Sequence, residues 1–150
     1  ICRRGCGMAY DHGNIFARIL RGEVPAQKFF EDERTIAILD AMPQSDGHSL
    51  VIPKCAAENI FQLDPAFAGA VMRTAQQVAG TLRDVFEADG ITLMQFNGAE
   101  AGQTVFHFHL HVVPRHGDDG IALSWPRKDP PRDTLEGYAA RLRQALADVA

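Results

Sequence analysis

The apolar positions near the start of the chain predict a short helix followed by three strands. Asn14 can cap a helix that carries four apolar residues on one face and that Gly22 can end. These apolar residues are Ile15, Phe16, Ile19 and Leu20. β-Prone runs follow at 28–30, 35–39 and 49–52, and the charged residues between the first two runs are typical of a hairpin.

The rest of the pattern predicts a long helix, two strands and a last helix. Asp64 before Pro65 favours a helix start, and apolar residues recur at helical spacing as far as Gly90. They are Phe67, Val71, Val78, Leu82, Val85 and Phe86. Strands are expected at 91–96 and 104–113, on either side of a glycine-rich loop. Thr134 would cap the last helix. Its inner stripe would consist of Leu135, Tyr138, Leu142 and Leu146.

This order of elements predicts an α+β fold with a mainly antiparallel five-stranded sheet, because the short connections allow hairpins but not crossovers. A length of 150 residues favours one domain with room for a core, and we expect residues 8–150 to form it. Residues 1–7 do not share the pattern, and we interpret them as an expression remnant or a mis-called start ahead of Met8. Hydrophobic residues make up 46% and charged residues 23%, a balance that excludes a disordered chain.

Charge and cysteine content narrow the choice of partner and compartment. A net charge of −4 argues against a broad nucleic-acid-binding surface. No apolar run approaches the roughly 20 residues that cross a bilayer, so no membrane partner is expected. With three cysteines and no secretory signal, a disulfide framework is not expected and a cytoplasmic location is favoured.

The segment 105–113 carries the most informative pattern of the chain. In a strand, side chains alternate between faces, so His107, His109 and His111 would point the same way. The other face, formed by Phe106, Phe108, Leu110 and Val112, would anchor the strand in the core. Folding alone does not require three imidazoles in a row.

Three interpretations of this row compete. The histidines could be half exposed on a solvated sheet face. They could bind a metal ion, but the outer two would start about 13 Å apart, so one ion could not easily hold all three. Alternatively, a neutral imidazole is a nucleophile at neutral pH, and its neighbours can orient it and donate to phosphoryl oxygens. Gln103 and the glycine loop before the strand suit a bound phosphate, which favours the third interpretation.

The chain resembles the histidine triad (HIT) superfamily over about residues 14–114. The run His107 to Val113 reads as the family's His-x-His-x-His-x-x signature. Further motifs follow in the family's order: Asn14-Ile15-Phe16-Ala17-Arg18-Ile19, Phe30-Glu31-Asp32 with Leu39-Asp40, Gly47-His48-Ser49-Leu50-Val51-Ile52-Pro53-Lys54, Asn97-Gly98 and Gly102-Gln103-Thr104-Val105. The resemblance implies a HIT-like fold and nucleotidyl transfer to water.

The resemblance also implies roles for individual residues. His109 would attack the α-phosphorus and form a nucleotidyl-histidine intermediate that water hydrolyses. The other expected catalytic residues are His107, His111, His48 and Gln103. The expected nucleotide-binding residues are Ile15, Phe16, Ile19, Asp40, Asn97, Gly102, Thr104 and Val105. The residues alone also allow structural roles. Ile15, Phe16 and Ile19 could be ordinary core residues, Asp40 could form a turn, and His48 could be a buried core histidine.

Departures from the family pattern limit these expectations. The opening helix lacks a Cys-x-x-Cys, and Cys55-Ala56-Ala57 follows Ile52-Pro53-Lys54 where many bacterial members carry a histidine. We therefore predict no structural zinc, and we interpret Cys55 as a small semi-buried residue. The Trp-Pro-Pro-Gly ending of the Hint-like phosphoramidases is also missing, and Val113-Pro114-Arg115 resembles the dinucleoside polyphosphate hydrolases and generic bacterial members.

The sequence thus predicts a HIT-type hydrolase that cleaves at the α-phosphate of a purine nucleotide conjugate or dinucleoside polyphosphate. The resemblance implies a homodimer and no cofactor. Two alternatives stay open, namely a nucleotide-binding regulator with vestigial catalysis and a metal-dependent hydrolase.

Overall fold

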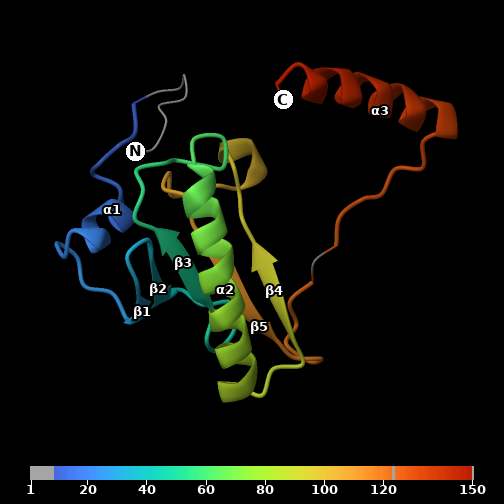
Figure 1. The fold of residues 1–150 in the computed structure, drawn as a ribbon. Helices are drawn as coiled ribbons and strands as arrows, with labels where there is room; N and C mark the ends of the chain where they lie inside the picture. The colour runs from blue at the N-terminus through green and yellow to red at the C-terminus, as the bar shows by residue number, and fades with distance from the viewer. Residues whose placement is uncertain (1–8, 123, 150) are drawn as a thin grey trace. The chain divides into compact units, whose positions relative to one another are not determined.

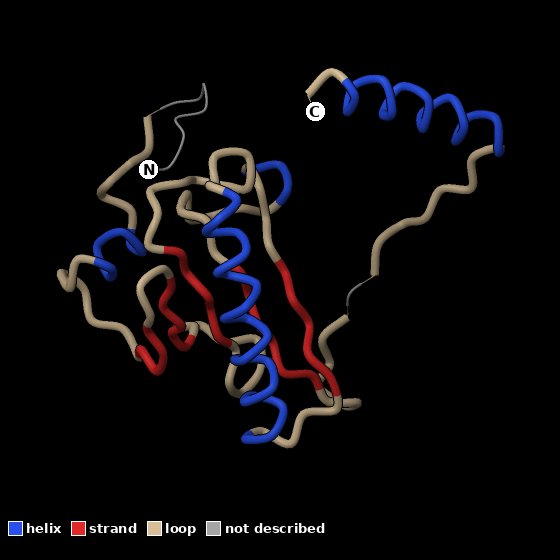
Figure 2. The backbone as a smooth tube through the Cα atoms, in the orientation of Figure 1, coloured by secondary structure: helices blue, strands red, loops and turns tan. Residues whose placement is uncertain are grey.

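The computed structural model describes residues 9–122 and 124–149, and the interpretation of residues 1–7 lies outside them. The chain divides into two units, of which one extends to Gly120 and the other begins at Ile121. The first unit holds two α-helices, a five-stranded sheet and a 3-10 turn, and the second holds one helix (Figures 1 and 2). The predicted α+β class is confirmed.

The sheet is antiparallel throughout, with the strand order β1-β2-β3-β5-β4. Its strands are β1 (Lys28–Glu31), β2 (Thr35–Leu39), β3 (Ser49–Pro53), β4 (Gly90–Met94) and β5 (Leu110–Arg115). β3 and β5 are neighbours in the sheet although the long helix and β4 separate them in sequence. In this pairing Leu50 lies opposite His111.

The central strands are buried because a helix covers each face of the sheet. On one face α2 (Pro65–Val85) packs a core cluster that includes Val51, Leu110 and Val112. On the other face α1 (Ile15–Leu20) contributes Phe16 to a cluster with Leu50 and Ile52. Every residue of β3 is therefore buried.

Both helices begin where the sequence predicts. Asn14 caps α1 through its side-chain oxygen, which accepts from the Ala17 amide at 2.9 Å. Asp64 caps α2 in the same way through the Ala66 amide at 2.8 Å. The long helix ends at Val85 rather than at Gly90, because Glu87 adopts a positive φ of 49° that stops helical geometry.

The histidine segment is only partly a strand. The β5 ladder begins at Leu110, six residues later than predicted. Ahead of it, the Phe108 amide donates to the Ala57 carbonyl in the loop after β3, at 2.8 Å, instead of joining the ladder. Phe108, Leu110 and Val112 are buried as predicted, but Phe106 is 38% exposed, so its expected place in the core was wrong.

The second unit contains α3 (Arg132–Ala147), which begins two residues before the predicted cap Thr134. Pro131 precedes the first turn, where its fixed φ suits a helix start. None of the residues of α3 is buried, and the stripe predicted to face inward is more than half exposed. A unit of this size cannot form a core of its own. Among the described residues, no helix is long and apolar enough to cross a membrane.

Candidate functional site

The rings of His107 and His109 both lie against Phe16, and His109 lies beside His111, so the three side chains form a row. The ring centroids of His109 and His111 are 5.0 Å apart. A fourth histidine joins at one end, because β3 begins one residue after His48 and runs beside β5. The resulting distance from His48 Nε2 to His111 Nδ1 is 2.9 Å.

Hydrogen bonding fixes the tautomer of His109. Its Nδ1 lies 2.7 Å from the carbonyl oxygen of His107, and a carbonyl only accepts, so Nδ1 carries the proton. In the neutral ring the lone pair therefore sits on Nε2. The ring is 8% exposed, and Phe16 holds it edge-on with a centroid distance of 4.8 Å. This arrangement leaves an oriented lone pair on Nε2, which is what the nucleophile predicted for the central histidine would need.

Two consecutive hydrogen bonds connect the Gln44 amide to His111 through His48. The backbone amide of Gln44 donates to His48 Nδ1 at 3.0 Å, which places the proton of neutral His48 on Nε2. Nε2 then donates to His111 Nδ1, so the proton of neutral His111 sits on its Nε2. Backbone geometry thereby makes His111 Nε2 a hydrogen-bond donor, and the His111 ring lies next to that of His109.

His107 is held by two partners, and one of them, Tyr10, was not predicted from the sequence. Its Nε2 donates to the Pro53 carbonyl at 2.9 Å, so its Nδ1 is an acceptor. The Tyr10 hydroxyl donates to that Nδ1 at 2.5 Å, and Tyr10 in turn accepts from the Asn14 side-chain amide at 2.8 Å. Tyr10 and His107 are 97 residues apart, and no local pattern in the sequence links them.

Burial keeps this row of imidazoles neutral. It lowers the pKa of His107 to about 4, against the smaller raising effect of the Pro53 carbonyl. Burial, followed by the neighbouring His109 and His48, lowers the pKa of His111 to about 4 as well. The pKa values of His109 and His48 are also lowered, chiefly by burial. All four rings are thus uncharged at neutral pH.

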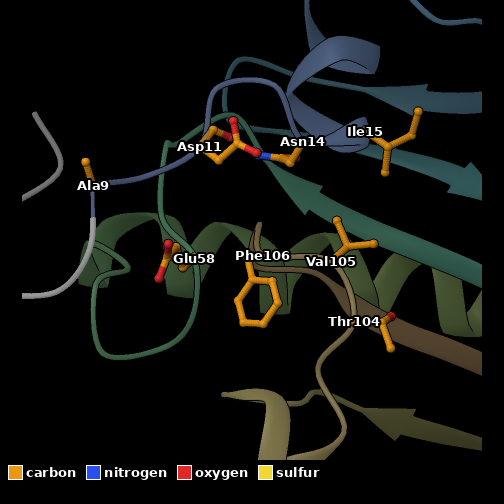
Figure 3. A pocket seen from close by; sticks show the side chains of 8 residues that line it. All are labelled: Ala9, Asp11, Asn14, Ile15, Glu58, Thr104, Val105 and Phe106. Carbon is orange, nitrogen blue, oxygen red and sulfur yellow. The ribbon is translucent and has the colours of Figure 1, made fainter.

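The three predicted base-pocket residues of α1 separate in the structure. Ile15 lines a cavity of about 510 Å³ together with Thr104, Val105 and Phe106. Figure 3 shows Ile15 on one side of this cavity and Val105 and Phe106 opposite. Phe16 is in the core against His109, whereas Ile19 lines a different cavity of about 220 Å³. His109 is not among the residues that line the larger cavity.

The predicted phosphate loop is organised by its own side chains. Gln103 is buried, its Oε1 accepts from the Gly98 amide at 2.7 Å, and its Nε2 donates to the carbonyls of Glu58 and Val105. Its side chain therefore positions the loop in this structure. Asn97 likewise uses its side-chain oxygen to accept from the Ile60 amide at 2.8 Å. Gly102 has a φ of 96°, which favours glycine.

Asp40 lies beside the hydrogen bond between His48 and His111. One carboxylate oxygen accepts from the Met42 amide at 2.9 Å, the turn-forming role that sequence alone allowed. The other is 3.5 Å from His48 Nε2. Asp40, His48 and His111 bring possible ligand atoms within 4.8 Å of one another. However, a metal ion would need the lone pair of His48 Nε2, and the Gln44 amide bond places a proton there, so these residues do not fit a cation site.

Cys55 lies in the core cluster under α2 and is 5% exposed. It is disulfide-bonded, so it is more than the small semi-buried residue that the sequence predicted.

Comparison with known proteins places this geometry in a family. Residues 21–118 match the family model described as the HIT domain. The chain is 39% identical over 136 residues to Protein hit of Bacillus subtilis, covering 89% of this chain and 94% of that protein. The crystal structure of a HIT family protein from Bacillus anthracis superposes with a TM-score of 0.84 at 34% identity, covering 89% and 96% of the two chains.

Two relatives have names that state an activity. One is the Arabidopsis thaliana adenylylsulfatase HINT3, 36% identical over 110 residues, which cover 73% of this chain and 56% of that protein. The other is the Candida albicans adenosine 5'-monophosphoramidase HNT1, 28% identical over 147 residues, covering 95% and 97%. A solved histidine triad nucleotide-binding protein from Candida albicans has a TM-score of 0.85 at 27% identity, covering 92% of this chain and 100% of that chain.

Proposed function

Since this chain belongs to the HIT family, we propose that it hydrolyses a purine nucleotide conjugate at the α-phosphate, with His109 as the nucleophile. The observation that carries the proposal is the tautomer of His109, whose Nδ1–H is bound by the His107 carbonyl so that Nε2 offers its lone pair. The activities named for the two relatives, on an adenylyl sulfate and an adenosine phosphoramidate, support this reaction class.

The proposed reaction has two displacements at phosphorus. The His109 Nε2 lone pair forms an N–P bond while the bond from phosphorus to the leaving atom breaks. That atom keeps the bonding electron pair and takes a proton from solvent. Water then attacks the phosphorus, the N–P electrons return to Nε2, and the water's proton goes to solvent. The Nε2–H of His111 can donate to a phosphoryl oxygen throughout, which stabilises the developing charge.

The sugar and phosphate would contact the residues that surround this row. We propose Asp40 for the ribose hydroxyls, Phe16 and Ile15 beside the base, and the Asn97–Val105 loop near the phosphate. Ile19 lines a separate cavity from Ile15, so we do not propose it for the base. Gln103 would act through the loop that it holds rather than by touching substrate, because both its side-chain oxygen and its side-chain nitrogen are bonded to backbone. We also propose a cytoplasmic homodimer that uses no cofactor.

The test is hydrolysis of a fluorogenic adenosine phosphoramidate and of diadenosine tetraphosphate by the protein and by His109→Ala. We expect kcat to fall by at least about a thousandfold, as is usual when a nucleophile is removed, while AMP binding persists. His116→Ala is the matched control, since His116 contacts the Phe86 carbonyl away from the row. Equal turnover in the His109 variant would refute the proposal, and AMP binding without turnover in either protein would favour the regulator.

A further inference from the structure

Asn97 is followed by Gly98, and asparagine followed by glycine is chemically prone to deamidation. In this reaction the main-chain nitrogen of the second residue attacks the side-chain amide carbon of the asparagine. Glycine opposes the attack least, because it has no Cβ and its backbone turns freely. The other asparagines of the chain, Asn14 and Asn59, both precede isoleucine, whose branched side chain hinders the same attack. Among the asparagines, the chemistry therefore singles out Asn97.

The structure holds the attacking nitrogen through Gln103. The Gly98 N–H donates to Gln103 Oε1 at 2.7 Å, and the Gly98 carbonyl accepts from the Gln103 amide at 3.0 Å. Gln103 is 4% exposed, and its Nε2 donates to the carbonyls of Glu58 and Val105 at 2.6 and 3.0 Å. Because a carbonyl only accepts, these two bonds fix the Gln103 oxygen toward Gly98.

The amide group that would be attacked is held as well. Asn97 and Gln95 exchange two side-chain hydrogen bonds, from Gln95 Nε2 to Asn97 Oδ1 at 2.8 Å and from Asn97 Nδ2 to Gln95 Oε1 at 2.6 Å. The Ile60 amide donates to the same Asn97 oxygen at 2.8 Å. Rotation of the Asn97 side chain about its Cα–Cβ bond therefore costs these hydrogen bonds.

We infer that Asn97 is a deamidation site that the folded loop protects, and that Gln103 is the main protecting group. In the reaction, the Gly98 nitrogen gives its proton to solvent and its electron pair forms a bond to Asn97 Cγ. The bond from Cγ to Nδ2 then breaks, and this nitrogen leaves as ammonia with the bonding pair and a proton from solvent. Water opens the resulting succinimide to aspartate or isoaspartate. The Gly98 N–H must leave Gln103 before the first step, and the inference does not depend on the proposed function.

Deamidation would change the loop that the sequence predicts to bind phosphate. A carboxylate at position 97 can still accept from the Ile60 amide, but it has no donor for Gln95 Oε1, so the reciprocal pair with Gln95 is lost. The carboxylate also adds a negative charge, and isoaspartate lengthens the backbone by one carbon. Protection of Asn97 therefore preserves both the charge and the shape of this loop.

Peptide mapping by mass spectrometry, over a time course at mildly alkaline pH, tests the inference on the full chain. In the unaltered protein, deamidation at Asn97 should be at least about tenfold slower in the folded state than in urea, because hydrogen bonds must break first. Gln103→Leu should speed the folded-state reaction by about tenfold and leave the rate in urea unchanged. Asn14 and Asn59 in the same digest are internal references. Gln76→Leu, at an exposed position of α2, is the matched control and should behave like the unaltered protein.

The outcomes that contradict the inference are distinct. Equal rates in the folded protein and in urea would show that the fold gives no protection. A folded Gln103→Leu that deamidates as slowly as the unaltered protein would show that Gln103 is not the protecting group. If circular dichroism shows that this variant does not fold, hydrogen exchange of the Gly98 amide in the unaltered protein decides. We expect that amide to exchange more slowly than in urea, and exchange at the same rate would overturn the inference.

Discussion

The hydroxyl of Tyr10 donates to Nδ1 of His107, 97 residues further along the chain. Because the Pro53 carbonyl binds the opposite nitrogen, this contact leaves the His107 ring one orientation and one tautomer. The His107 carbonyl in turn holds His109. Tyr10 is thus a positioning residue two steps removed from the proposed nucleophile.

Tyr10→Phe should weaken activity without removing it. The His107 Nδ1 would lose its donor in a buried place, which costs about 1–3 kcal/mol for an unsatisfied polar group. We expect kcat to fall by about threefold to thirtyfold, with a smaller change in KM. Nitrogen-15 NMR of the histidine rings should show His107 losing its single tautomer.

Tyr138→Phe is the matched control, because Tyr138 is 54% exposed on α3. It should leave both kcat and the NMR spectrum unchanged. An unaltered His107 spectrum in Tyr10→Phe would contradict the positioning role.

The buried histidines make the fold sensitive to acid. The pKa of His107 is about 4 in the folded chain and near 6.5 when unfolded, so the unfolded state binds more protons between these values. Stability should therefore be constant above about pH 6.5 and fall as the pH drops toward 4, by on the order of 3 kcal/mol for His107. His111 adds a contribution of the same sign.

Urea denaturation at pH 7, 5.5 and 4 measures this dependence. His107→Gln lowers stability at every pH but should make the slope between pH 7 and 4 shallower. A slope identical to that of the unaltered protein would show that His107 does not carry the effect.

Position 47 requires glycine for two reasons, its backbone conformation and the close approach of the Phe86 ring. Its φ is 84°, and a Cβ placed there would come within 2.5 Å of the Phe86 ring. Gly47→Ala should cost about 1–2 kcal/mol for the left-handed backbone and a further 1–3 kcal/mol for the overlap. It should also reduce activity, because His48 is the next residue.

Gly22→Ala supplies the comparison, since Gly22 has a similar φ of 76° with nothing within 4 Å. Its cost in thermal or urea denaturation should be the backbone part alone. Equal losses in the two variants would mean that Phe86 moves aside freely.

A buried hydrogen bond fastens α2 to the sheet. The hydroxyls of Thr35 on β2 and Thr74 on α2 are 2.7 Å apart, and both residues are fully buried. Thr74→Val keeps the volume and should lower the free energy of unfolding by about 1–2 kcal/mol. Thr81→Val, on the exposed part of the same helix, should cost less than half as much, because its hydroxyl bonds only the Gln77 carbonyl. Equal losses in the two variants would contradict this.

The sequence correctly predicted the elements whose bounds depend on neighbouring residues. β2 spans the predicted residues 35–39, and Asn14 and Asp64 cap the two helices as expected. The alternation of histidine and apolar residues correctly placed His107, His109 and His111 on one side. Each of these features depends on residues within one or two turns or a few strand positions.

Features set by distant partners could not be predicted in this way. Phe106 continues the apolar alternation but lies where no strand pairs with the chain, so it is exposed. Ile15 and Ile19 share a helical face yet line different cavities. The tautomers depend on Gln44, Pro53 and Tyr10, which only the folded backbone brings to the imidazoles.

The neighbouring positions of β3 and β5 have a consequence for folding. His48 and His111 are 63 residues apart in sequence, and they meet only after the chain between them, including α2 and β4, has closed into a loop. Closing a loop of that length costs conformational entropy that the short hairpin β2–β3 does not incur. A partly folded chain that has formed only the meander of β1 to β3 does not yet bring His48 to His111. His111 then lacks the hydrogen bond from His48. The proposed catalytic activity would therefore depend on the finished sheet and would be gained in the same step as the pairing of β3 with β5.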